Sequence, residues 1–345
     1  MKIMIAPIRI VPCVVFAAMI LSLSGSGALA QTIKLASIAP EGSPWNDALV
    51  DIGHQWKEIT GGKVKLRIYP GGVAGDEPDM LRKMRIGQLH AAAVTTLGLI
   101  SVVPDIEAIT FPMQIRTDEE LQAVLQAVGP EIEEQLLEKG YKILGWSMAG
   151  WIHFFSRNKV ETAEDLRKQK LFFWGSDTVY VGLLKTLGFQ PVALPVTDLL
   201  PSLQTGLVDA FAAPPVGALS FQWFALAKNM STLRWQPTPT VVVIREKDWN
   251  RIPEKFHAEL EAAARKVNDG LWAKSRELEK QSIDAMIEHG LKVHQAEETV
   301  HDEFKSMVEE QGLPVFLEKR FSPAFFKKVQ AALADFRIRS ETSDR

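Results

Sequence analysis

The sequence predicts an α/β protein with two lobes and a long helix that crosses both of them. Short β-type runs alternate with amphipathic helical segments between residues 32 and 245, which is the pattern of βαβ units. From residue 253 to 289 an apolar stripe recurs at helical spacing, and a helix of about 35 residues would be about 50 Å long. The 345 residues are enough for two domains, since one domain takes about 150 residues.

In the first half of the chain, capping residues and glycines mark the ends of the helices. Ser43 supplies an N-cap and Pro44 an N1 proline for a helix that ends before Gly61. Gly87 and Gly140 end later helices. We expect strands at 32–38, 64–69, 89–95, 142–148 and 151–156, a helix at 76–86 and two helices within 117–139.

The second half continues this alternation and then becomes helical. Thr162 starts a short helix, and Gly188 closes the helix that begins at Thr178. Residues 340–345 are expected to form a loose tail. We expect strands at 170–174, 191–194, 207–213, 238–245 and 291–294, helices at 178–187, 198–205 and 253–289, and two more helices that end near 337.

The first 30 residues have the features of a cleavable signal peptide. Lys2 and Arg9 are their only charged residues, an apolar run follows from 10 to 23, and small residues end at Ala30. Pro12 interrupts the apolar run, which is shorter than the roughly 20 residues of a membrane-spanning helix. We therefore expect cleavage after Ala30 and export to the periplasm.

Charge and motifs argue against nucleic-acid binding and against catalysis. The net charge is −3 and no block of Lys and Arg occurs, so a nucleic-acid ligand is not expected. Ser147 lies in Gly-Trp-Ser-Met-Ala, which lacks the last glycine of a nucleophile elbow. The seven histidines lack metal-binding spacing, and Cys13, the single cysteine, would leave with the signal peptide. We expect no enzyme, no cofactor and no metal, but a ligand-binding protein that closes about a cleft.

Six short segments, spread over both halves of the chain, carry a family pattern. They are GGVAGDE at 71–77, MRIGQL at 84–89, PDIEAITFP at 104–112, LGFQPV at 187–192, LQTGLVD at 203–209 and EKDW at 246–249. In order and spacing the chain resembles the solute receptors of tripartite ATP-independent periplasmic (TRAP) transporters, the DctP-like family. The resemblance covers about residues 32 to 335.

This resemblance implies a periplasmic-binding-protein-like fold, in which crossing strands and the long helix join two α/β lobes that close over one small molecule. It also implies a partner, a membrane permease of a small and a large subunit driven by an ion gradient. We expect the receptor itself to be a monomer. By analogy, a signal peptide at 1–30 precedes lobe I at 31–149 plus 239–278, and lobe II comprises 150–238 plus 279–345.

Three positions at which family members have polar ligand-binding residues are apolar here. Phe172 stands where most members have an arginine that holds a ligand carboxylate, Ile152 stands at a second arginine position, and Ala213 replaces an asparagine. A carboxylate buried without a guanidinium would lose several kcal/mol of solvation, so we expect an aromatic or largely apolar ligand. Because side chains alternate along a strand, the residues that would share these faces are Phe154, Trp174 and Phe211.

Polar candidates remain at the ends of predicted elements, where they could orient a hydroxyl, amide or amine. They are Asp76, Glu77, Thr95 and Thr96 in lobe I, and Thr197 beside the apolar Val196 in lobe II. Three alternatives stay open. The apolar side chains could be ordinary core behind a shifted cleft, the ligand could be an organic acid held by Lys170 or by water, or the chain could be a sensory module without a permease.

Overall fold

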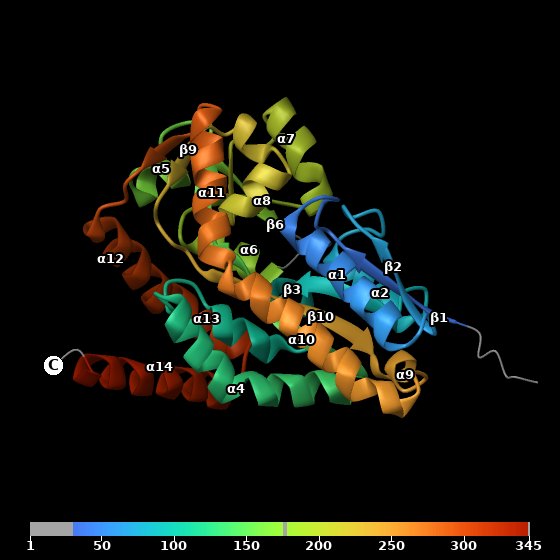
Figure 1. The fold of residues 1–345 in the computed structure, drawn as a ribbon. Coiled ribbons are helices and arrows are strands. Elements are labelled where there is room, and N and C mark those ends of the chain that lie inside the picture. Colours follow the sequence, from blue (N-terminus) through green and yellow to red (C-terminus); the bar gives the residue numbers. More distant parts are fainter. Residues whose placement is uncertain (1–29, 175–177, 344–345) are drawn as a thin grey trace, which may run out of the picture.

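The computed structural model describes residues 30–174 and 178–343, and it contains two mixed β-sheets surrounded by helices (Figure 1). The predicted signal peptide, with Cys13, lies outside the described residues apart from Ala30. Within the described residues, no helix is both long and apolar enough to cross a membrane.

The first sheet has five strands in the order β2-β1-β3-β10-β4. Strand β1 is parallel to both β2 and β3, whereas β10 is antiparallel to β3 and to β4. The strands are β1 (Gln31–Ser37), β2 (Val64–Tyr69), β3 (Ala91–Thr95), β4 (Tyr141–Trp151) and β10 (Pro237–Arg245). Helices α1 (Pro44–Ile59) and α10 (His257–Ala273) pack together beside this sheet, where the buried Trp56 donates its indole N–H to the carbonyl of Leu260 at 2.9 Å.

The second sheet has six strands in the order β11-β9-β5-β8-β6-β7. They are β5 (His153–Ser156), β6 (Lys170–Trp174), β7 (Gln190–Leu194), β8 (Ala210–Ala213), β9 (Asn229–Ser231) and β11 (Lys292–His294). The chain passes between the sheets three times: β4 leads directly into β5, β9 leads back to β10, and α10 and α11 connect β10 to β11. The first two passages, the crossing segments, bond to each other: Ile152 N–H donates to the carbonyl of Gln236 and Trp235 N–H to the carbonyl of Ile152, both at 2.9 Å.

The remaining helices complete the fold around the sheets. Those before β10 are α2 (Glu77–Arg85), α3 (Thr96–Leu99), α4 (Asp118–Glu138), α5 (Ala163–Arg167), α6 (Thr178–Thr186), α7 (Leu199–Thr205) and α8 (Pro215–Ser220), with 3-10 turns η2 (Pro104–Thr110), η3 (Val196–Asp198) and η4 (Trp223–Ala225). After β10 come α9 (Glu246–Trp249), η5 (Glu254–Phe256), α11 (Ser275–Glu288), α12 (Glu298–Met307), the π-turn η6 (Val308–Gly312), α13 (Leu313–Lys319) and α14 (Pro323–Ser343).

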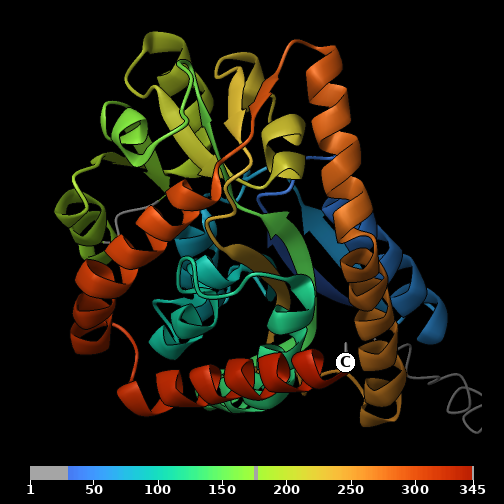
Figure 2. The same cartoon turned by 90° about the vertical axis from the view of Figure 1, so that its left-hand side faces the viewer.

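Several helix predictions were wrong. After β11 the structure has three α-helices instead of two, and α14 continues to Ser343 through the first residues of the expected loose tail. The helix expected at 253–289 is interrupted at Lys274, where α10 ends and α11 begins. The interruption lies where the main packing partner changes, since α10 packs on β4 and α1 whereas α11 packs mainly on α8 and less on β4. Together the two helices still run past both sheets (Figures 1 and 2). The segment 117–139 forms one helix, α4, with Pro130 inside it. Buried residues at helical spacing continue on both sides of this proline, from Val124 to Leu136, so core packing outweighs the lost hydrogen bond.

Helix α14 lies along α4, as both ribbon views show (Figures 1 and 2). Arg337 of α14 pairs with Glu120 at 2.7 Å, and Lys328 pairs with Glu131 at 2.6 Å. The division of the chain into lobes remains a proposal, but this packing moves α14 from lobe II, to which the sequence analysis assigned it, to the side of lobe I.

Candidate functional site

A cavity of about 180 Å³ lies between the two sheets, with walls from strands of both and from the two crossing segments. Its lining is dominated by aromatic and aliphatic side chains. The nine aromatic residues that line it are Trp45, Phe154, Phe172, Phe173, Trp174, Tyr180, Phe221, Trp223 and Trp235. An engineered apolar cavity of about 150 Å³ can hold benzene, so this one has room for a single ring with substituents.

The structure brings most of the sequence-predicted site residues to this cavity. Eight of them line it: Phe172, Trp174, Ile152, Phe154, Ala213, Val196, Glu77 and Thr95. The other four, Phe211, Thr197, Asp76 and Thr96, are absent from the described lining. The three positions at which the family pattern loses a polar residue therefore all line the cavity. Ligand contact by each residue remains a prediction.

The prediction that Phe211 shares the cavity wall with Ala213 was wrong. The two side chains do lie on one face of β8, but Phe211 is paired with Phe155 of β5, further from the cavity. The two rings stack with centroids 4.9 Å apart in the core of the second sheet. Ala213 is the last residue of β8, and the neighbouring Ala212 also lines the cavity. At this end of the strand, side chains on both faces of the sheet therefore reach the cavity. Strand alternation alone could not distinguish these positions.

Asp76 joins the two lobes instead of lining the cavity. As N-cap of α2 it accepts a hydrogen bond from the backbone of Glu77 at 2.8 Å. Its two carboxylate oxygens also accept the indole N–H of Trp174, at 2.9 and 2.7 Å, and one accepts the backbone N–H of Val196 at 3.3 Å. Trp174 ends β6 and Val196 follows β7, and both strands belong to the second sheet, so these hydrogen bonds link the two sides of the cavity.

Among the described residues that line the cavity, Glu77 is the only charged one. Its side chain is 1% exposed and accepts the backbone N–H of Thr95 at 2.9 Å, while its second oxygen lies 2.8 Å from the Thr95 hydroxyl. Desolvation by burial raises the pKa of Glu77 to about 8, despite these hydrogen bonds. The carboxyl group is therefore mostly protonated and neutral at pH 7, and it can donate a hydrogen bond.

No Lys, Arg or His occurs among the described lining residues. Lys170, the cation proposed for an organic acid, is exposed at the start of β6, and its ammonium group donates to the carbonyl of Gly206 at 3.0 Å. Arg157 donates to the carbonyl of Leu203. Strand alternation would have allowed Lys170 to face the cleft, but it lies at the opposite end of β6 from Trp174.

A polar stripe on the crossing strands was missed by the sequence analysis. Gln236, Thr238 and Thr240 line the cavity at every second position along the segment that leads into β10. Ser147 on β4 pairs with Thr240, and their hydroxyl oxygens are 2.6 Å apart. The alternation at 236, 238 and 240 was visible in the sequence, but only the pairing of β10 with β4 shows that this face meets the cavity.

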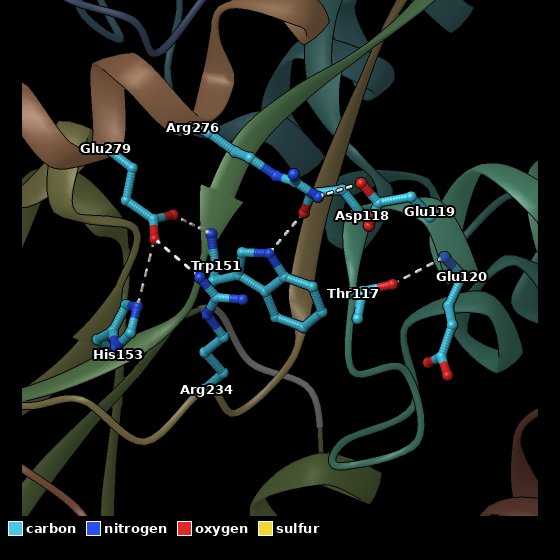
Figure 3. Close-up of polar contacts among 9 residues, drawn as sticks. All are labelled: Thr117, Asp118, Glu119, Glu120, Trp151, His153, Arg234, Arg276 and Glu279. Carbon is cyan, nitrogen blue, oxygen red and sulfur yellow. Dashed lines mark hydrogen bonds and ion pairs between the residues drawn. The ribbon is translucent and has the colours of Figure 1, made fainter. Parts of the chain in front are cut away.

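A polar network lies where the chain crosses between the lobes (Figure 3). Glu279 of α11 accepts the backbone N–H of Trp151 at 3.1 Å and lies 3.8 Å from both His153 and Arg234. Buried Trp151 donates its indole N–H to Asp118 at 2.7 Å, and hydrogen bonds and charge from His153, Trp151 and Arg234 keep the pKa of Glu279 below its usual value although burial opposes this. The network therefore ties both crossing segments to α11.

Comparison with known proteins agrees with this architecture. The family model for bacterial extracellular solute-binding proteins, family 7 (DctP), matches residues 35–317. An uncharacterised Salmonella typhimurium protein, YiiZ, is 29% identical over 52% of this chain and 55% of its own length. The 2,3-diketo-L-gulonate-binding periplasmic protein YiaO of Escherichia coli is 23% identical over 83% of this chain and 88% of its own.

Solved structures share the fold. A TRAP periplasmic solute-binding protein from Xanthobacter autotrophicus, with bound β-D-galacturonate, superposes with a TM-score of 0.81 at 20% identity, over 88% of this chain and 99% of that one. The two-lobed α/β fold and the family resemblance expected from the sequence are both confirmed. The family consists of solute-binding proteins and not of enzymes. The chain belongs to family 7 of the bacterial extracellular solute-binding proteins, the receptors of TRAP transporters.

Proposed function

We propose that this chain is the periplasmic receptor of a TRAP transporter for a neutral solute with an aromatic or largely apolar body. One observation carries the proposal: the described residues that line the cavity include nine aromatic side chains and no cation. Pockets of this kind bind through buried apolar area, and a few polar groups orient the ligand. The solute would be delivered to the small and large permease subunits after export of the receptor by its signal peptide.

Electrostatics support a neutral ligand. A carboxylate placed in this cavity would lose its hydration without gaining a guanidinium or ammonium partner. Glu77 would add repulsion in its ionised form. The galacturonate of the Xanthobacter protein and the diketogulonate of YiaO each carry a carboxylate, so this receptor would differ from those relatives in the charge of its solute.

Closure of the lobes would bury the solute between them. The hydrogen bonds from Trp174 and Val196 to Asp76 cross the cleft beside the cavity, and they stabilise only the closed arrangement. A ligand that contacts both lobes would shift the population toward this arrangement, and the permease would recognise the closed receptor.

An organic acid is the second candidate, because relatives bind such ligands. Lys170 gives it no support, since its ammonium group lies away from the cavity. Glu77 offers another route: with a pKa raised to about 8 it retains its proton at pH 7 and could share it with a ligand carboxylate. Such binding would weaken steeply as the pH rises through 8, whereas binding of a neutral aromatic solute would depend far less on pH.

A thermal-shift screen of the chain from Gln31 onward tests the proposal. Neutral ring compounds such as acetophenone and indole would be compared with benzoate, succinate and galacturonate. A ligand at 100 times its dissociation constant adds about 2.7 kcal/mol of stability. Stabilisation by neutral ring compounds alone supports the proposal, and stabilisation by acids alone refutes it.

A further inference from the structure

Three polar side-chain atoms of the cavity lining have no hydrogen-bond partner among the described residues and are not fully enclosed by protein. They are the amide nitrogen Nε2 of Gln236, the amide oxygen Oδ1 of Asn268 and the indole nitrogen Nε1 of Trp223. Two other unpaired atoms of the lining, in Trp45 and Thr238, are fully enclosed, so no ligand can reach them. Because most buried polar atoms in proteins have a partner, the three accessible atoms are the groups to which a solute can bring one.

The amide of Gln236 is held in one orientation by a short chain of hydrogen bonds among residues of the lining. Trp235 donates its indole N–H to the hydroxyl oxygen of Tyr180 at 2.9 Å, and this hydroxyl donates to Oε1 of Gln236 at 3.1 Å. Because an indole N–H can only donate, the Tyr180 hydroxyl accepts from Trp235 and keeps its own proton for Gln236. The amide oxygen therefore faces Tyr180, and Nε2 is left with two N–H groups that no described residue accepts.

The three accessible atoms differ in the ligand group that they fit. The amide nitrogen of Asn268 is bonded to a backbone carbonyl of its own helix at 2.8 Å, so Oδ1 is left to accept and fits a ligand donor. Trp223 and Gln236 both fit an acceptor. The ring of Trp223 packs against Phe211 in the core of the second sheet, whereas Gln236 lies in the crossing segment between the two sheets and presents two donors instead of one.

We propose that Nε2 of Gln236 faces the cavity and donates a hydrogen bond to a neutral acceptor of the solute, so that the substrate class is an aromatic molecule with a carbonyl or ether oxygen on the side of the crossing segments. A neutral acceptor fits better than a carboxylate, because the described lining holds no cation. This inference rests on the proposed function, since it assumes that a neutral aromatic solute occupies the cavity. It adds the position and the polarity of one substituent, and it assigns Gln236 as a specificity-determining residue.

A pair of probes with nearly the same shape tests this inference. Acetophenone has a carbonyl oxygen where α-methylstyrene has a methylene group. Their dissociation constants would be measured by calorimetry at pH 7 for the wild type, Gln236→Met and Trp223→Phe. Gln236→Met removes the amide and keeps the length of the side chain, and Trp223→Phe removes the competing donor. Gln169→Met is the matched control, since Gln169 is a buried glutamine outside the described lining whose amide oxygen and nitrogen are both hydrogen-bonded.

We expect the wild type to bind acetophenone about three- to tenfold more tightly than α-methylstyrene, as one neutral hydrogen bond would give. Gln236→Met should abolish this preference by weakening the binding of acetophenone alone, whereas Trp223→Phe and Gln169→Met should preserve it. Equal binding of both probes by the wild type, or a preference that survives in Gln236→Met, would overturn the inference and leave the proposed function intact. Failure of both probes to bind would refute the proposed function, and the inference with it.

The wild type also allows a measurement that needs no variant. In nuclear magnetic resonance spectra of the isotope-labelled protein, the side-chain amide protons of Gln236 should shift downfield with acetophenone but not with α-methylstyrene, because a hydrogen bond to an oxygen deshields them. An equal response of these protons to both probes would overturn the inference even if Gln236→Met failed to fold.

Discussion

Replacing Asp76 with alanine should open the receptor in the absence of ligand. The carboxylate of Asp76 accepts the indole N–H of Trp174 from the opposite lobe at 2.7 Å. A hydrogen bond to a charged group contributes about 1.5–3 kcal/mol. Its loss, together with the longer bond from Val196, should lower the ratio of closed to open molecules roughly 10- to 150-fold.

The same substitution also removes the N-cap of α2, which should cost about 1 kcal/mol of folding stability. Trp174→Phe separates the two effects, because it deletes the donor from lobe II and leaves the Asp76 cap of α2 in place. Asp79→Ala is the matched control. It removes a carboxylate from the same helix, but among the described residues Asp79 pairs with the exposed Arg82 alone, in an ion pair that contributes little to stability.

The distance between the lobes can be measured with spin labels. The single cysteine, Cys13, lies in the predicted signal peptide, so cysteines introduced at Lys65 of β2 and Lys185 of α6, both exposed, would be the only ones labelled. Pulsed electron resonance should show longer distances for Asp76→Ala and Trp174→Phe than for the wild type and Asp79→Ala. Identical distance distributions in all four proteins would show that these bonds do not hold the lobes together.

Three further predictions follow from the site. Phe172→Arg should weaken binding of neutral aromatic probes at least tenfold, because it buries an unpaired charge in the wall; calorimetry showing unchanged affinity would remove Phe172 from the site. Glu77→Gln should change how stability depends on pH. The pKa of Glu77 is about 8 in the folded chain and has its ordinary value of 4.5 in the unfolded chain, so the folded wild type binds more protons between these values. Its free energy of unfolding should therefore fall by up to about 1.4 kcal/mol per pH unit as the pH rises from 4.5 to 8. In the variant, urea unfolding at pH 5 and pH 8 should show a smaller loss, and an identical loss would contradict the raised pKa. Glu279→Ala should lower the free energy of unfolding by about 1–3 kcal/mol, since the backbone N–H of Trp151 loses its acceptor. An unchanged denaturation midpoint would argue against a role of Glu279 in connecting the crossing segments to α11.

The sequence predicted the walls of the site better than its polar groups. Phe172, Ile152 and Ala213 were identified because the family pattern assigns a polar residue to each position, and all three line the cavity. The polar stripe of Gln236, Thr238 and Thr240 could not be identified in this way. Its place at the cavity depends on the pairing of β10 with β4, which lies far away in the sequence.

The ends of the helices also show that local sequence signals are readable whereas the effects of tertiary packing are not. Capping residues located the start of α1 at Pro44 and the end of α2 close to Gly87, because these signals are local. The break at Lys274 has no such signal, since neither proline nor glycine occurs there and the polarity pattern continues. Conversely, Pro130 is a local signal for a helix end that the packing of α4 overrides. Tertiary packing decided both cases.

Calorimetric titration of the chain from Gln31 onward with acetophenone and with benzoate, at pH 7, would compare the same ring with a neutral and an ionised substituent. A cavity without a cation in its described lining predicts that acetophenone binds at least tenfold more tightly than benzoate. Tighter binding of benzoate would contradict the account, because it would require that the receptor stabilise a buried carboxylate without a cation among the described lining residues.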